Sequence, residues 1–293
     1  MSCCVTRIFG QLVSAYAAAK KLRCWASVIR RMPSSKCGPP IERPGSRADM
    51  TQKCGPDRPA TTVSVDTQVG DLGMDSTIEH AAGTMPGCVG LLGAGGQARE
   101  VASYLPSGTK VFWAVSPEYL DAAGHDQVDI TAPSPAARNA WVVGAVGAPA
   151  LRRDLVAAWP GDRFVTVVSP AAYVDPSCTI GAGTVIAPGA VLTVDVVVGE
   201  HCQVNIGAML SHDVYLASFV TIGPGAHLAG RVRLGDGVFV GVGANISNDV
   251  TIASGVVVGA GATVLADVMT PNAVVAGVPA SVVKIRDGWL DAL

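Results

Sequence analysis

A histidine followed directly by an aspartate, His212 and Asp213, is the pair of side chains in this sequence best suited to proton transfer. A neutral imidazole takes a proton from a hydroxyl or an amine, while a carboxylate beside it fixes the tautomer and stabilises the imidazolium. Acyl transfer needs this chemistry, because the acceptor must lose a proton as it attacks the acyl carbon. A single surface histidine more often has no catalytic role, so the surroundings of the pair decide its meaning.

A repeat of six residues shows which elements hold this pair. Between Val174 and Val264 an aliphatic residue recurs at every sixth position, sixteen times without an insertion. A small or β-branched residue stands four places after each aliphatic one. A period of six fits neither the 3.6 of a helix nor the 2 of a plain strand. It predicts a left-handed parallel β-helix, a triangular coil in which each hexapeptide forms one face and glycine or asparagine eases the turn.

The coil converts sequence spacing into positions in space. Three hexapeptides make one turn, so residues eighteen apart are stacked about 4.8 Å from each other. His212 is therefore stacked on Gly230, and Asn205, on the preceding face, is stacked on Gly223. Because Gly230 has no side chain, its peptide N–H can meet a thioester oxygen as it becomes an oxyanion. The arrangement predicts acyl transfer with His212 as the general base.

The other histidines and the cysteines give no metal site. His201 and His227 lie eleven residues before and fifteen residues after His212, spacings that disfavour a shared zinc ion, and we expect structural roles for both. Five of the 8 cysteines lie in the first 84 residues, and the chain has no CxxC pair. We therefore predict neither a bound metal nor a disulfide framework.

Ahead of the coil, residues 85–170 alternate short apolar runs with helical segments. We expect strands at 88–92, 111–115, 141–146 and 164–168, and helices at 97–105 and 151–159. Strands alternating with helices imply a parallel sheet. The segment is too short for a complete dehydrogenase domain, so we predict a small Rossmann-like N-terminal domain.

A glycine-rich turn, GAGGQARE from Gly93 to Glu100, joins the first strand to the first helix of this domain. Such a turn exposes backbone N–H groups at a helix N-terminus, where a pyrophosphate can bind, and Gly93, Gly95 and Ala98 match the G-x-G-x-x-A form of a dinucleotide fingerprint. The second strand, however, ends without an acidic residue for a ribose. A tight turn that binds nothing stays the alternative.

The first 84 residues differ in composition from the rest. They hold 11 Lys and Arg against 7 Asp and Glu, and the remainder holds 10 against 16. A stretch rich in Pro, Gly, Ser and Thr follows the basic part, and no periodic apolar face is present. We expect residues 1–84 to be a disordered extension, either an organellar transit peptide or, as we favour, upstream sequence without a native role. The acidic balance of the remainder argues against nucleic acid, and no apolar run is long enough for a membrane span.

Several motifs in residues 87–285 resemble the bacterial sugar acetyltransferases of the PglD/NeuD type. These motifs are GAGGQAREV after the first strand, FVTVVSPAAYV before the coil, and NIGAMLSHD, PGAHLAG and AGVPASVVK within and after it. The resemblance implies a small nucleotide-binding-like domain (85–170), a β-helix acyltransferase domain (171–283) and a tail or short helix (284–293). It further implies a cytoplasmic homotrimer that takes acetyl-CoA as co-substrate, holds no permanent cofactor, and acetylates an amine or hydroxyl of a nucleotide-linked amino sugar or a sialic-acid-like sugar.

The resemblance also assigns residues to roles. His212 matches the catalytic base, Asp213 its acidic support, and Asn205 an asparagine lining the pocket. Gly230 matches the glycine whose amide meets the thioester. The remaining matches are the closing segment near the CoA adenine (Gly277, Val278 and Pro279) and the loop expected to contact the sugar nucleotide (Gly93, Gly95, Gly96 and Gln97).

Two departures from the family pattern leave the acceptor open. Val115, Ser116 and Pro117 stand where an acidic pair usually follows the second strand, and Thr221 occupies a position that can be histidine in the amino-sugar enzymes. The sequence does not distinguish N- from O-acylation, the sugar or the acyl chain length. Two other functions compete with the transferase: a non-catalytic trimer that binds a nucleotide or sugar, and a nucleotide-sugar oxidoreductase. The missing ribose acid counts against the oxidoreductase, and the His212 and Gly230 stack counts against the non-catalytic binder.

Overall fold

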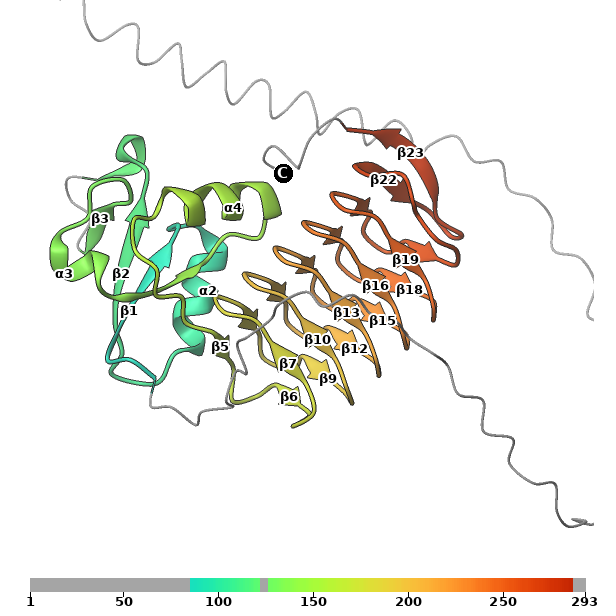
Figure 1. The fold of residues 1–293 in the computed structure, drawn as a ribbon, viewed down its shortest axis with the longest axis horizontal. Helices are drawn as coiled ribbons and strands as arrows, with labels where there is room; N and C mark the ends of the chain where they lie inside the picture. Colours follow the sequence, from blue (N-terminus) through green and yellow to red (C-terminus); the bar gives the residue numbers. More distant parts are fainter. Residues whose placement is uncertain (1–84, 122–125, 287–293) are drawn as a thin grey trace, which may run out of the picture. The chain divides into compact units, whose positions relative to one another are not determined.

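A computed structural model describes residues 85–121 and 126–286. The extension expected over residues 1–84 and the tail beyond residue 286 lie outside the described residues. Two kinds of structure follow each other along the chain: a small α/β unit and a regular coil of short strands (Figure 1). Within the described residues, no helix is long and apolar enough to cross a membrane.

The coil has the predicted period at every repeat. Sixteen two-residue strands, β6 to β21, each end on one of the predicted aliphatic residues, so the register holds without a shift. Their bounds are β6 Tyr173–Val174, β7 Thr179–Ile180, β8 Val185–Ile186, β9 Val191–Leu192, β10 Val197–Val198, β11 Gln203–Val204, β12 Met209–Leu210, β13 Tyr215–Leu216, β14 Thr221–Ile222, β15 His227–Leu228, β16 Arg233–Leu234, β17 Phe239–Val240, β18 Asn245–Ile246, β19 Thr251–Ile252, β20 Val257–Val258 and β21 Thr263–Val264.

Three parallel sheets form the faces of the coil. The first face holds β5 (Val167–Val168), β8, β11, β14, β17 and β20, followed by β22 (Ala273–Ala276) and the antiparallel β23 (Ser281–Ile285). The second face runs from β6 to β21 in steps of three strands, and the third face from β7 to β19. Strands β5 to β21 each pair with a strand eighteen residues away, as in Val197 with Tyr215. The chain therefore passes over the first, second and third faces in turn, with a corner after each.

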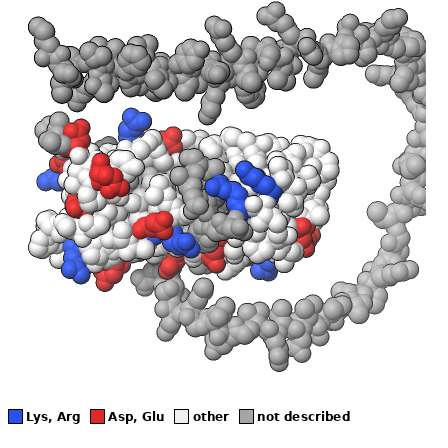
Figure 2. Space-filling model, turned by 90° about the horizontal axis from the view of Figure 1, so that it is seen from above, with Lys and Arg blue, Asp and Glu red and all other residues white. Residues whose placement is uncertain are grey.

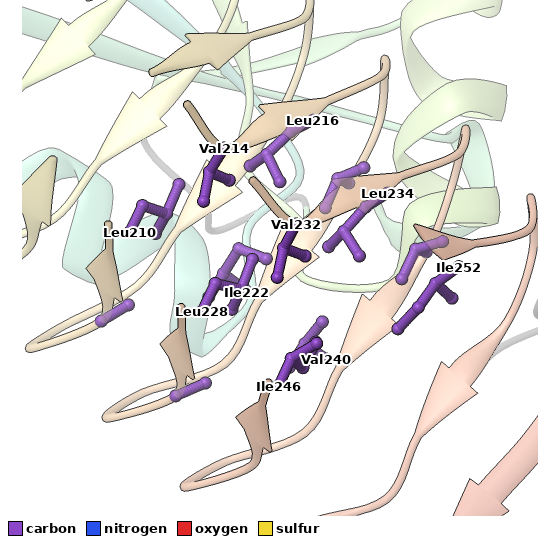
Figure 3. Close-up of a cluster of buried hydrophobic side chains, with 14 of the residues drawn as sticks. Leu210, Val214, Leu216, Ile222, Leu228, Val232, Leu234, Val240, Ile246 and Ile252 are labelled. Atoms are coloured by element: carbon purple, nitrogen blue, oxygen red, sulfur yellow. The ribbon is translucent and has the colours of Figure 1, made fainter. Parts of the chain in front are cut away.

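The interior of the coil is a stack of aliphatic side chains. The second residue of each strand points inward, and the small or β-branched residue four places later fills the corner, as with Leu210 and Val214 (Figure 3). Along the stack Leu210, Leu216, Ile222 and Val232 are fully buried. Each turn of the coil stacks its aliphatic side chains on those of the preceding turn. The coil therefore buries apolar area without a helix or a long strand.

The α/β unit contains a four-stranded parallel sheet in the order β3-β2-β1-β4. Its strands are β1 (Cys88–Leu92), β2 (Lys110–Val115), β3 (Gln127–Asp129) and β4 (Trp141–Gly144). Its helices are α2 (Gly96–Tyr104), α3 (Pro135–Arg138) and α4 (Pro149–Ala158), with a 3₁₀ turn, η1, at Pro117–Tyr119. Strands β1, β2 and β4 and helices α2 and α4 match the predicted elements to within two residues at each end. Strand β3 falls in a segment predicted to be a loop.

The last strand predicted for the α/β unit, 164–168, is divided between the two regions. Phe164 makes an isolated bridge to Val142 of β4, whereas Val167–Val168 forms β5 and pairs with β8 on the first face of the coil. The coil therefore starts one hexapeptide before Val174. The prediction was wrong here because the short apolar run fits the end of one sheet and the start of the other equally well.

The first face of the coil packs against the α/β unit. Its outward-pointing residues Val185, Gln203, Thr221 and Val257 are buried, and Ala150 of α4 belongs to a common apolar cluster with Val257. The second and third faces differ, because outward-pointing residues there are exposed (Met209, His227, Asn245, Val197, Tyr215 and Arg233).

Candidate active site

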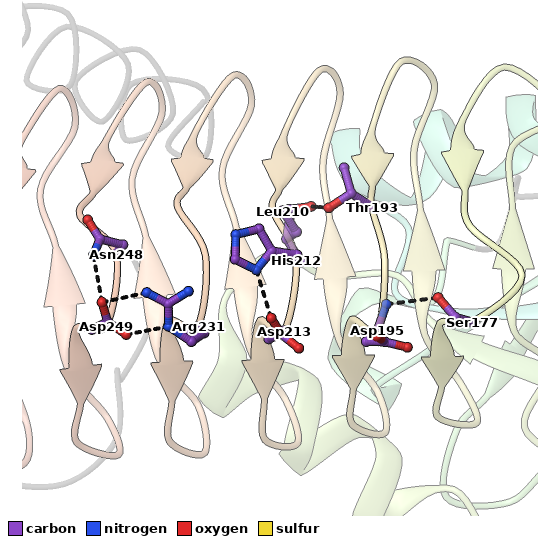
Figure 4. A network of polar contacts seen from close by, with 9 residues as sticks. All are labelled: Ser177, Thr193, Asp195, Leu210, His212, Asp213, Arg231, Asn248 and Asp249. Carbon is purple, nitrogen blue, oxygen red and sulfur yellow. Dashed lines mark hydrogen bonds and ion pairs between the residues drawn. The ribbon is translucent and has the colours of Figure 1, made fainter. Parts of the chain in front are cut away.

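His212 and Asp213 lie at the corner between the second and third faces, just after β12. The residue after the histidine takes a left-handed conformation, with φ of 59° at Asp213, and this turns its carboxylate back toward the ring. His212 Nδ1 and Asp213 Oδ2 are 2.7 Å apart, and both side chains are about half exposed (Figure 4). This contact leaves Nε2 as the nitrogen available for proton transfer.

Gly230 lies one turn along the coil from His212, as the spacing predicted. A Cβ built on Gly230 would lie 2.5 Å from His212 Nε2 and Cε1, so the imidazole fills the place where a side chain would stand. The coil hydrogen bonds on either side of Gly230 are donated by the N–H groups of Ala229 and Arg231. Within the described residues, the Gly230 N–H donates no backbone hydrogen bond. On this corner the imidazole of His212 therefore covers a residue whose amide takes no part in the backbone ladder.

An ion pair follows on the same corner. Arg231 contacts Asp249 through Nε and Oδ1 at 2.5 Å and through Nη2 and Oδ2 at 2.8 Å, and Asn248 adds a bond to Asp249 Oδ2 at 2.6 Å (Figure 4). The bonds from Arg231 and Asn248 lower the pKa of Asp249 to about 2. Both partners of the ion pair are half exposed, so we expect it to orient the corner more than to stabilise the fold.

A groove of about 510 Å³ lies where the α/β unit meets the first face of the coil. Gln97 and Glu100 of α2, together with Gly147, contribute from one side, and Asn205 and Thr221 from the other. Gln97 Nε2 donates to Asn205 Oδ1 at 3.1 Å, so two predicted site residues 108 positions apart meet here. Asn205 Nδ2 in turn donates to the Ile222 carbonyl at 2.8 Å, which fixes the orientation of its amide.

Asn205 and His212 occupy different corners of the coil. Asn205 follows β11, between the first and second faces, and His212 follows β12, between the second and third faces. The width of the second face, occupied at this level by Met209–Leu210, separates them within one chain. Both residues were predicted to line one pocket, and the structure of a single chain does not bring them together.

Of the four residues predicted to contact the sugar nucleotide, only Gln97 lines the groove. Gly93 has φ of 114° and its N–H donates to the Ala114 carbonyl, so it serves the turn after β1. Gly95 precedes helix α2 and Gly96 begins it, both exposed, while Gln97 lines the groove.

The segment Gly277, Val278 and Pro279 forms the turn between β22 and β23. Thr263 of the second face donates its N–H to the Gly277 carbonyl at 3.0 Å, and Val278 is exposed. The segment therefore lies beyond the last strand of the second face.

Arg152 of α4, for which no role was predicted, is the most buried charge of the described residues. Its Nε donates to the His201 carbonyl at 2.7 Å, Nη1 to the carbonyls of Val146 and Gly147 at 2.6 and 3.2 Å, and Nη2 to Thr221 Oγ1 at 3.0 Å. Nη2 also contacts two further carbonyls, Phe219 at 2.8 Å and Val220 at 3.2 Å. No local pattern signals this role, because an arginine in an amphipathic helix ordinarily faces solvent.

The two other histidines among the described residues have different surroundings. His201 is buried, stacked on Phe219 at 5.0 Å between ring centroids and edge-on to Phe164 at 4.7 Å. Burial, and then the charge of Arg152, lower the pKa of His201 to about 4. His227 is exposed and contacts Asn245. Across residues 85–121 and 126–286, no cluster of three or more His, Cys, Asp or Glu side chains is arranged to hold a metal ion.

Solved structures resemble this chain over about two thirds of its length and nearly all of theirs. Perosamine N-acetyltransferase from Caulobacter crescentus, in complex with CoA and GDP-perosamine, is 29% identical, with a TM-score of 0.60, over 68% of this chain and 98% of that one. The acetyltransferase domain of PglB from Neisseria gonorrhoeae FA1090, in complex with acetyl coenzyme A, is 31% identical, with a TM-score of 0.59, over 67% and 98%. WeeI from Acinetobacter baumannii AYE, at 24% identity and a TM-score of 0.58, shows the shared fold.

No protein-family model matches the sequence, and a search of curated proteins gives no match. The structural matches place the chain in a class of transferases built on left-handed β-helices. Within that class, the identity and coverage of the gonococcal domain show that this chain belongs to the hexapeptide-repeat sugar acetyltransferases.

Proposed function

We propose that this protein transfers an acetyl group from acetyl-CoA to an amine or hydroxyl of a nucleotide-linked sugar, with His212 as the general base. The observation that carries the proposal is the corner where His212, paired with Asp213, lies against the bare amide of Gly230. The relatives support the co-substrate and the class of acceptor, since they are bound to CoA, acetyl-CoA or GDP-perosamine.

In the proposed mechanism, Nε2 of His212 takes a proton from the acceptor as the acceptor attacks the thioester carbon. The Gly230 N–H then donates to the oxygen of the tetrahedral intermediate. Asp213 accepts from the protonated Nδ1 and stabilises the imidazolium, whose proton passes to the departing thiolate of CoA.

The coil offers a track of suitable length for CoA. Gly277 lies one layer beyond Thr263, which is stacked three turns from Met209 on the second face. At about 4.8 Å per layer, this is a span of about 19 Å from the level of His212, the scale of an extended pantetheine arm. We therefore propose that Gly277, Val278 and Pro279 contact the adenine end.

We further propose that the active protein is a cytoplasmic homotrimer, with the groove at Gln97 and Asn205 receiving the sugar nucleotide. The two corners that hold His212 and Asn205 are separated within one chain. In the trimer, an acceptor held near Asn205 of one copy would lie next to His212 of an adjacent copy. Exposed apolar residues at these corners and on the uncovered faces support such packing, among them Val194, Ile206, Met209 and Val242.

The proposal is tested by measuring acetyl-CoA consumption with UDP-, GDP- and CMP-linked amino sugars, their hydroxyl counterparts and free sialic acid. Titration calorimetry with acetyl-CoA and with NAD separates the transferase from a dinucleotide-binding protein. We expect acetyl-CoA to bind, and Gly230→Val to weaken that binding, because the new side chain would occupy the space beside Nε2. Binding of NAD without acetyl-CoA would overturn the proposal, and light scattering that showed an active monomer would overturn the trimer.

A further inference from the structure

The guanidinium of Arg152 joins the two regions that form the groove. Its partners are Val146 and Gly147 from the α/β unit, and residues at 201 and 219–221 from the coil. The arm of the side chain passes over Gly144 of β4, where an added Cβ would lie 2.8 Å from Arg152 Cγ. A neighbouring bond joins the same two regions in the opposite direction, since Gln203 Nε2 of the coil donates to the Gly144 carbonyl at 2.9 Å.

The charge of Arg152 is held by neutral groups. Its six hydrogen-bond acceptors are five carbonyl oxygens and one hydroxyl. Burial lowers the pKa of Arg152 to about 10, which still leaves the group charged at neutral pH. A buried charge without a carboxylate is stable only while each of its N–H groups keeps an acceptor. Movement of either region away from the other would break several of these bonds together, so the arginine resists such movement.

Two of the acceptors also line the groove. Thr221 Oγ1 accepts from Arg152 Nη2 at 3.0 Å and donates to the Gly147 carbonyl at 2.7 Å, which closes a triangle of hydrogen bonds across the contact between the regions. Both residues line the groove where the two regions meet, Gly147 from the α/β unit and Thr221 from the coil. Arg152 therefore bonds to both members of a contact that lines the groove.

We propose that Arg152 is a positioning residue that sets the width of the acceptor groove by holding Gly147 of the α/β unit against Thr221 of the coil. The inference rests on the proposed function of the groove. Lysine cannot replace arginine here, because a single ammonium offers three donors at one point and cannot reach acceptors on both sides. Arg152 acts on how the acceptor is held, while the His212 corner, which lies between the other two faces, keeps its own geometry.

The test compares full-length Arg152→Lys and Thr221→Val with matched controls. Arg153→Lys makes the same change one position along α4, where the side chain is exposed. Thr179→Val changes a threonine at the same place in its hexapeptide on the third face. The acceptor is GDP-perosamine, or the sugar nucleotide that gives the highest rate in the screen. The measurements are acceptor KM, kcat, acetyl-CoA Kd and the unfolding midpoint.

We expect Arg152→Lys to raise the acceptor KM by about tenfold or more, as misplacement of a binding group does, with acetyl-CoA Kd unchanged within about twofold. Thr221→Val should move KM in the same direction by less, and both controls should leave it unchanged. Hydrogen exchange should increase around residues 145–151 and 219–221 in Arg152→Lys and stay unchanged at 238–258.

An acceptor KM unchanged in both Arg152→Lys and Thr221→Val would overturn the inference, whatever happens to the unfolding midpoint. If Arg152→Lys proves insoluble, Thr221→Val decides alone, since it removes one corner of the triangle without removing the charge. Failure of the wild-type protein to consume acetyl-CoA with any acceptor is a different result, because it would overturn the proposed function itself. In that case the exchange measurement still tests whether Arg152 holds the two regions together.

Discussion

The coil is held together by contacts that repeat along the chain, whereas the groove between the coil and the α/β unit is held by single contacts between distant residues. Every strand of the coil pairs with a strand eighteen residues away, so its shape is repeated locally and its corners can change residue type freely. The groove depends instead on single contacts between distant residues, such as Gln97 with Asn205 and Arg152 with Thr221. In the proposed function, the corner at His212 carries the chemistry and the junction between the two regions selects the acceptor.

The largest expected effect comes from removing the base at the corner. His212→Ala should lower kcat by about 10²–10⁴-fold with acetyl-CoA affinity nearly unchanged, because the imidazole acts on the proton and the amide of Gly230 stays in place. His227→Ala, which changes an exposed histidine on the second face, is the control. Retention of more than about a third of kcat, on a scale where general bases contribute at least 10²-fold, would show that the base is elsewhere.

A second comparison concerns the two cores. Leu216 in the coil and Leu91 in β1 are both fully buried. Substitution of either by alanine should reduce the free energy of unfolding by about 2–5 kcal/mol. We expect the larger loss at Leu216, because the hydrogen-bonded ladder holds Val198 and Leu234 on either side and prevents collapse into the cavity. Chemical denaturation at one protein concentration measures both, and an equal or larger loss at Leu91 would show that the coil relaxes as readily as a helix-covered sheet.

The two regions also differ in how far the sequence predicts them. All sixteen repeats from Val174 to Val264 follow from one local rule, and Gly230 is stacked on His212 as the spacing requires. The α/β unit follows from alternation and turn signals, apart from β3 and the divided segment 164–168. The junction does not follow, because burial of Arg152 depends on acceptors 49 to 69 positions further along the chain. No pattern within a window of sequence records such a contact, whereas the resemblance to a family suggested Gln97 and Asn205.

A smaller effect is expected at the buried corner between the third and first faces. Burial lowers the pKa of His201 to about 4, below its ordinary value of 6.5. Between these two pH values the histidine is protonated in the unfolded chain and neutral in the folded chain. Stability should therefore be fully present above pH 6.5 and fall as the pH drops toward 4, by at most about 1.4 kcal/mol per pH unit from this group. His201→Phe should flatten this dependence. Phe219, one turn along, tolerates the same left-handed backbone, with φ of 59° against 53° at His201. Denaturation midpoints between pH 4 and 7 that are equally steep in both proteins would contradict the assignment.

The smallest expected effect comes from removing residues 1–84. The groove, the His212 corner and the cores of both regions are built from residues after this segment, and the solved relatives are matched over almost their full length by about two thirds of this chain. The shortened protein should begin at Met85, because this side chain packs against the core beneath β1. We expect its kcat, acceptor KM and unfolding midpoint to equal those of the full chain. A second truncated protein, beginning at Gly90, is the contrast, since it lacks Cys88 and Val89 of the central strand β1 and should fail to fold its α/β unit. If the protein starting at Met85 were insoluble or about tenfold slower, the basic segment would have a part in folding or catalysis that its composition does not reveal.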